Sequence, residues 1–94
     1  MPTRSYDEGL LERLQDPEAA AEYLTACFED AEEVFLLALR SVVEAHGGVR
    51  KLADLTELNR ESLYRLLSEE GNPRLSSLST ILESLGIQLQ FAAA

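Results

Sequence analysis

The chain has 94 residues, 46% of them apolar, and its 17 acidic against 8 basic side chains give a formal net charge of −9. This length suits a single small domain, and one cysteine and one histidine leave no material for a disulfide framework or a metal centre built on those residues. Because no apolar run reaches the length of a membrane span and the N-terminus lacks a basic-then-apolar signal, we expect a cytoplasmic protein without membrane contact.

The first half of the chain predicts two helices after an N-terminal segment over residues 1–15. Asp16 followed by proline is a strong helix start, with an N-cap aspartate and proline at the first helical position. That helix is expected over 17–28. A second, strongly periodic helix is expected over about 31–45, with Asp30 as its N-cap in a capping-box spacing.

The second half predicts shorter elements. Two short helices are expected over 49–56 and 60–68, and Asn59 is a good N-cap for the second. A further helix opens at Ser76 or Ser77 and ends at a glycine. The alternation of apolar and polar residues over about 87–91 is typical of a strand.

A single strand in a helical chain needs a partner for its backbone donors and acceptors. The same strand of a second copy is the preferred partner, which predicts a homodimer; a bound protein, an extended stretch near the N-terminus and a frayed tail are the alternatives. The expected fold class is therefore all-α, a five-helix domain over residues 16–94 with a short C-terminal β-strand.

The negative charge is concentrated in the first half. Residues 1–46 hold three basic and eleven acidic residues, whereas residues 47–94 hold five basic and six acidic residues. The second half is thus nearly neutral, and the net charge of the whole chain does not exclude DNA as its partner. Two ordinary solvated surfaces with a random asymmetry are the alternative interpretation.

The two short helices over 49–68 have the layout of a helix-turn-helix. Leucines pack one side, while polar and charged residues occupy the start and the outward side of the second helix. Arginine can donate two hydrogen bonds to guanine, and serine and tyrosine reach phosphates or base edges. The candidate DNA-binding residues are Arg60, Glu61, Ser62, Tyr64 and Arg65 in the second helix and Arg50, Lys51, Asn72 and Arg74 beside it. Ordinary surface arginines and a half-buried Tyr64 are the alternatives.

Four stretches are distinctive in combination: DPEAAAEYL (16–24), RESLYRLLS (60–68), GNPRL (71–75) and LGI (85–87) with its alternating tail. By these residues the chain resembles the lambda-repressor-like (Xre-type) helix-turn-helix proteins. It resembles still more closely the HigA-like addiction-module antidotes, which are antitoxins partnered with RelE/HigB-like toxins. The resemblance covers nearly the whole chain.

This resemblance implies a five-helix domain that binds double-stranded operator DNA as a homodimer, represses its own operon and neutralises a cognate toxin. By match to the family's pattern, the recognition helix begins at Asn59, and the DNA-facing role falls to Arg60, Glu61, Ser62 and Arg65. Toxins of this kind are basic RNA-cleaving proteins, so the acidic first half is matched to them in charge. An ordinary solvated acidic face is the alternative.

The chain departs from the family at Glu57, where the turn usually has glycine. If this position needs a positive φ, a residue other than glycine costs about 1 kcal/mol, and an acidic side chain there repels phosphate. Two alternatives therefore stay open. One is a protein-interaction antitoxin that no longer reads DNA strongly; the other is a stand-alone transcriptional regulator without a toxin.

The sequence predicts no enzyme. It has no nucleophile–base pair, no phosphate-binding loop and no metal-ligand spacing. We therefore assign no catalytic residue, no metal ligand and no cofactor.

Overall fold

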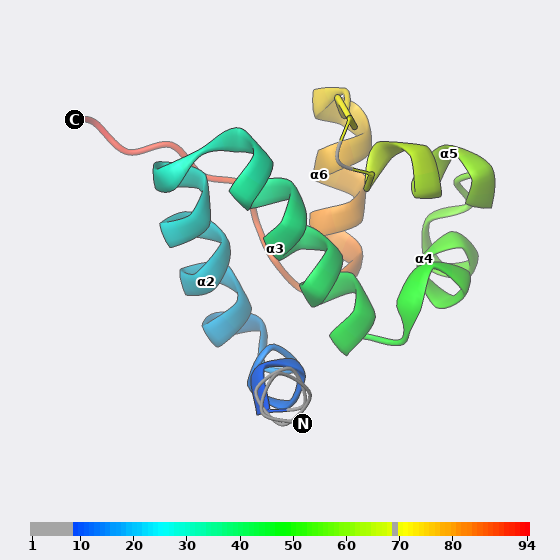
Figure 1. The fold of residues 1–94 in the computed structure, drawn as a ribbon, viewed down its shortest axis with the longest axis horizontal. Helices are drawn as coiled ribbons and strands as arrows, with labels where there is room; N and C mark the ends of the chain where they lie inside the picture. Colours follow the sequence, from blue (N-terminus) through cyan, green and yellow to red (C-terminus); the bar gives the residue numbers. More distant parts are fainter. Residues whose placement is uncertain (1–8, 69) are drawn as a thin grey trace.

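The computed structural model describes residues 9–68 and 70–94 (Figure 1). Within them, helices form over residues 9–13, α2 (Pro17–Asp30), α3 (Glu32–Ala45), α4 (Gly48–Thr56), α5 (Arg60–Leu66) and α6 (Leu75–Ser84). The first eight residues of the expected N-terminal segment lie outside the described part. None of the described helices is long and apolar enough to cross a membrane. The helical core agrees with an all-α fold, but the described chain has one helix more than expected.

The helices share one hydrophobic core. α2 and α3 lie side by side as an antiparallel pair, and α4 packs against α3, α5 and α6 (Figure 1). The largest fully buried side chains come from the N-terminal segment, α3, α5 and α6: Leu14, Leu39, Val42, Leu63 and Ile81. Burying each of these stabilises the fold by about 1.5–3 kcal/mol, so the core holds the short α5 in place together with the long helices.

The start of α2 confirms the predicted cap, whereas the predicted cap of α3 is wrong. Asp16 Oδ1 accepts a hydrogen bond from the Glu18 N–H at 3.3 Å. Asp30 instead remains the last residue of α2, and Ala31 is the N-cap of α3 without a side-chain hydrogen bond. Ala31 alone joins the two helices: its N–H donates to the Cys27 carbonyl at the end of α2, and its carbonyl accepts from Phe35 at the start of α3. Because Ala31 is the one residue between the helices, Asp30 stays helical and does not adopt the extended conformation of an N-cap.

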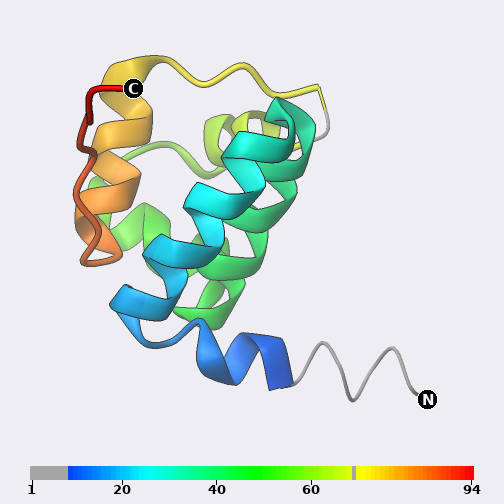
Figure 2. The same cartoon turned by 90° about the vertical axis from the view of Figure 1, so that its left-hand side faces the viewer.

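The predicted C-terminal β-strand is wrong, because no residue of the described chain is in a strand. α6 ends in a Schellman motif, in which the Ile87 N–H donates to the Leu82 carbonyl at 2.9 Å and the Gly86 N–H donates to the Glu83 carbonyl at 3.0 Å. Gly86 makes this possible with a φ of 79°. Ile87 is buried, and the tail turns back along α6 (Figure 2). Of the alternating apolar residues only Ile87 is buried, since Leu89 and Phe91 are 40% and 90% exposed. The argument for a homodimer through paired strands therefore fails.

Candidate functional site

The connection between α4 and α5 is held by two polar side chains. Thr56 Oγ1 donates to the Leu52 carbonyl at 2.7 Å and accepts from the Leu58 N–H at 3.2 Å. Asn59 Oδ1 accepts from the N–H groups of Glu61 at 2.7 Å and Ser62 at 3.3 Å, which confirms Asn59 as the N-cap of α5. These bonds satisfy backbone groups that a helix end leaves free. They fix the angle at which α5 leaves the turn.

The outward face of α5 carries the polar side chains that the sequence singles out. Leu63 is fully buried and Leu67 is 4% exposed, so one side of the segment faces the core. The exposed residues of the helix are Arg60, Glu61, Ser62, Tyr64 and Arg65. The tyrosine ring is 62% exposed and is therefore available for contacts outside the chain. The structure thus brings five of the nine candidate residues together on one short helix.

The other four candidates are spread over two places. Arg50 is exposed on α4. Lys51 is exposed as well. Its side chain lies beside Gly47, since a Cβ atom at that glycine would come within 2.6 Å of the lysine Cδ, and it lines a pocket near the ends of α3 and α6. Asn72 and Arg74 are exposed in the connection that follows the C-terminal end of α5, away from the Asn59 cap.

Glu57 has the left-handed conformation, with φ 62° and ψ 15°, and is the one non-glycine residue of the described chain with positive φ. Its side chain is exposed. The turn therefore does require the conformation that glycine adopts without strain. Sequence reasoning identified this position from the family resemblance.

Replacing Glu57 with glycine is expected to stabilise the chain by about 0.5–1 kcal/mol, because glycine removes the strain of a Cβ at positive φ. For a domain of this size, that gain raises the melting temperature by about 2–8 °C. Thermal unfolding followed by circular dichroism measures it. Glu57→Ala is the matched control, because it removes the same charge and keeps the Cβ; an equal gain in this control would contradict the strain argument.

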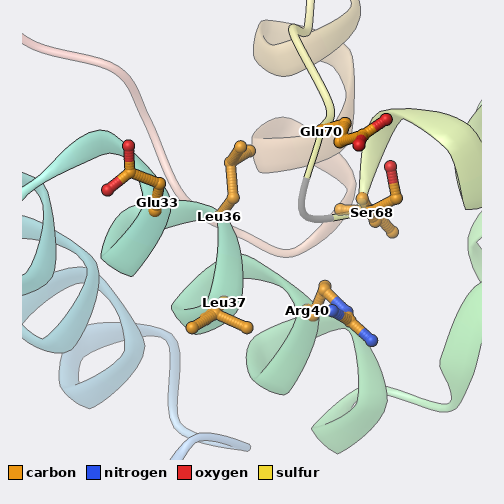
Figure 3. Close-up of a pocket in the computed structure, with 7 residues that line it drawn as sticks. Glu33, Leu36, Leu37, Arg40, Ser68 and Glu70 are labelled. Carbon is orange, nitrogen blue, oxygen red and sulfur yellow. The ribbon is translucent and has the colours of Figure 1, made fainter.

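The described surface also has two apolar grooves. The first, here the α3–α5 groove, lies between α3 and the end of α5, with Leu36, Leu37 and Arg40 on one side and Ser68 and Glu70 on the other (Figure 3). Leu37 is 49% exposed in it. Both signs of charge line this groove, and α5 ends beside it.

The second groove, here the α2–α6 groove, lies between α2, α6 and the C-terminal tail and is about 400 Å³ in volume. Its apolar side chains include Phe28, Phe35, Leu78, Leu89 and Phe91. The sequence places Phe28 on the apolar stripe of its helix, yet its side chain is 62% exposed. From the sequence, Phe28 suits either the core or an interface, because helical periodicity cannot distinguish a core stripe from an uncovered one.

Comparison with known proteins identifies two similarities. Residues 4–93 match the family model described as "Probable addiction module antidote protein". The chain is also 31% identical over 85 residues to an uncharacterized protein of Haemophilus influenzae, a match that covers 89% of this chain and 87% of that protein. No solved structure matches the chain significantly.

Proposed function

The chain belongs to the addiction module antidote family, and from this premise we propose that it neutralises a RelE/HigB-like toxin and, as a homodimer, represses its own operon by binding operator DNA through α5. Membership of the family makes it an antitoxin with a toxin as its partner. The proposal adds the type of toxin, the DNA and the dimer. It agrees with the resemblance to HigA-like, Xre-type proteins carried by residues 60–68 and 71–75.

The exposed face of α5 is the observation that carries the DNA-binding part. In a helix-turn-helix, the second helix enters the major groove and its N-terminal residues contact the base edges. Arg60 and Arg65 project from α5 while Leu63 anchors it to the core. Asn59 caps its start, so the backbone there is ordered before DNA binds. Arg50 and Arg74 are exposed on neighbouring elements and suit phosphate contacts.

Charge sets the expected strength of this binding. The second half of the chain has six acidic residues against five basic ones, so one protomer neutralises few phosphates. Its affinity is modest and falls as the salt concentration rises. Two protomers on two half-sites multiply the contacts, which is why the proposal includes a dimer.

A gel-shift titration with the DNA upstream of the chain's own gene, at 50 mM and 300 mM salt, tests the DNA-binding part. We expect a shift at the lower salt concentration that weakens at the higher one. Co-expression with the toxin encoded by the neighbouring gene tests the antidote part, with rescue of growth as the expected result. Rescue without any shift at low salt would remove DNA binding from the proposal and leave the antidote.

That outcome would favour the second candidate function, an antitoxin that acts by protein contact alone. Glu57 in the turn is the specific observation behind it, because its carboxylate is exposed beside the proposed DNA-facing side chains and would repel phosphate. A gene neighbourhood without a small basic protein would instead point to a stand-alone regulator.

A further inference from the structure

The α2–α6 groove exposes an ordered aromatic pair. Phe28 of α2 and Phe35 of α3 meet edge to face, with ring centroids 5.5 Å apart and an interplanar angle of 85°. Phe28 is 62% exposed, and Phe91 of the tail, which also lines the groove, is 90% exposed. A rigid apolar surface of this kind gains free energy when a partner covers it.

The last turn of α2 and the first turn of α3, which carry this aromatic pair, also carry three carboxylates. Glu29, Asp30 and Glu32 are all exposed and lie within four residues of Phe28. Within residues 9–68 and 70–94, none of these three carboxylate side chains has a hydrogen-bond or ion-pair partner. Glu29 and Asp30 also occupy the last turn of α2, where no basic residue is present and the helix dipole disfavours negative charge. A cationic partner would compensate Glu29 and Asp30 in this position, whereas Glu32 lies in the first turn of α3, where the helix dipole favours negative charge.

The sign of these charges selects the kind of partner. A second copy docked through the same groove would bring two sets of carboxylates together, and DNA or an anionic membrane would be repelled as well. A basic protein segment meets both features of the surface at once. α2 and the C-terminal tail, which line the groove, lie at the end of the molecule away from α5 (Figure 1), so an occupant held there leaves the proposed DNA-facing helix free.

Building on the proposed antidote function, we propose that the α2–α6 groove docks a basic, amphipathic segment of the cognate toxin. Apolar side chains of that segment pack against Phe28, Phe35 and Phe91, and its lysine or arginine side chains pair with Glu29, Asp30 and Glu32. The α3–α5 groove, in contrast, is lined by side chains of both charge signs, namely Glu33, Arg40 and Glu70.

Two double variants test this proposal by titration against the purified toxin encoded by the neighbouring gene. Phe28→Ser with Phe91→Ser is expected to weaken toxin binding at least 30-fold, since both side chains are exposed and the core is unchanged. Leu55→Ser is the control, because this leucine is 57% exposed on α4 outside the groove; it is expected to keep the wild-type affinity.

Glu29→Gln with Asp30→Asn is expected to have two opposite effects. Toxin affinity falls about tenfold, most strongly at low salt, while the melting temperature of the free chain rises by about 2–5 °C because the dipole mismatch is removed. Glu12→Gln with Glu44→Gln is the matched control, because both carboxylates are exposed, one in the helix over residues 9–13 and one near the end of α3. It is expected to leave toxin affinity unchanged.

The outcomes separate this proposal from the function on which it rests. Wild-type chain that fails to bind the toxin would overturn the proposed function. If the wild-type chain binds the toxin and the folded groove variants bind it equally well, only the assignment of the α2–α6 groove as the toxin site is overturned. Groove variants that change the sedimentation mass of the free chain, with toxin affinity intact, would assign the groove to a second copy and also overturn the proposal.

Discussion

Replacing Arg60 and Arg65 together with alanine is expected to weaken operator binding about 100-fold or more. Each arginine that donates two hydrogen bonds to a guanine contributes about 1–3 kcal/mol of discrimination. Both side chains are exposed on α5, and the helix itself is held by Leu63 and the Asn59 cap, which the substitutions leave intact. The free energy of unfolding is therefore expected to change little while DNA affinity collapses.

The matched control for this prediction is Arg13→Ala with Arg40→Ala. Both arginines are exposed and lie outside α5, so this pair changes the net charge by the same amount. Fluorescence anisotropy with labelled upstream DNA at one fixed salt concentration compares the two. Equal losses in both pairs would show that general electrostatics, not the face of α5, determines binding. If the Arg60→Ala, Arg65→Ala variant keeps its affinity for DNA, α5 is not part of the DNA interface.

Local signals predicted the α4–α5 region well. Asn59 caps α5 through bonds to residues only two and three positions away. Such features depend on a few neighbouring residues, so the sequence contains them directly. The exposure of the polar face of α5 follows from the same short-range periodicity. The positive φ of Glu57, in contrast, was expected only from the glycine that the family usually has there.

Features that depend on tertiary packing were predicted poorly. The tail after Gly86 alternates like a strand, but its course is set by the Schellman motif and by packing along α6, which no strand period encodes. The spacing of Phe28 suits either the core or an interface, and only its packing decides between them: its ring meets Phe35 of α3, yet it stays 62% exposed.

Replacing Leu63 with alanine is expected to destabilise the chain by about 3–4 kcal/mol, because a fully buried leucine loses its burial and leaves a cavity. Leu63 is the buried residue within α5, so the loss falls on the contact that orients the proposed DNA-facing helix. The melting temperature should fall by more than about 12 °C in a domain of this size. Urea unfolding at 25 °C measures the change, with the half-buried Leu66→Ala as the control expected to lose less. A loss below about 1 kcal/mol for Leu63→Ala would mean that α5 is not held by the core, and the ordered DNA-facing surface argued from that packing would then fail.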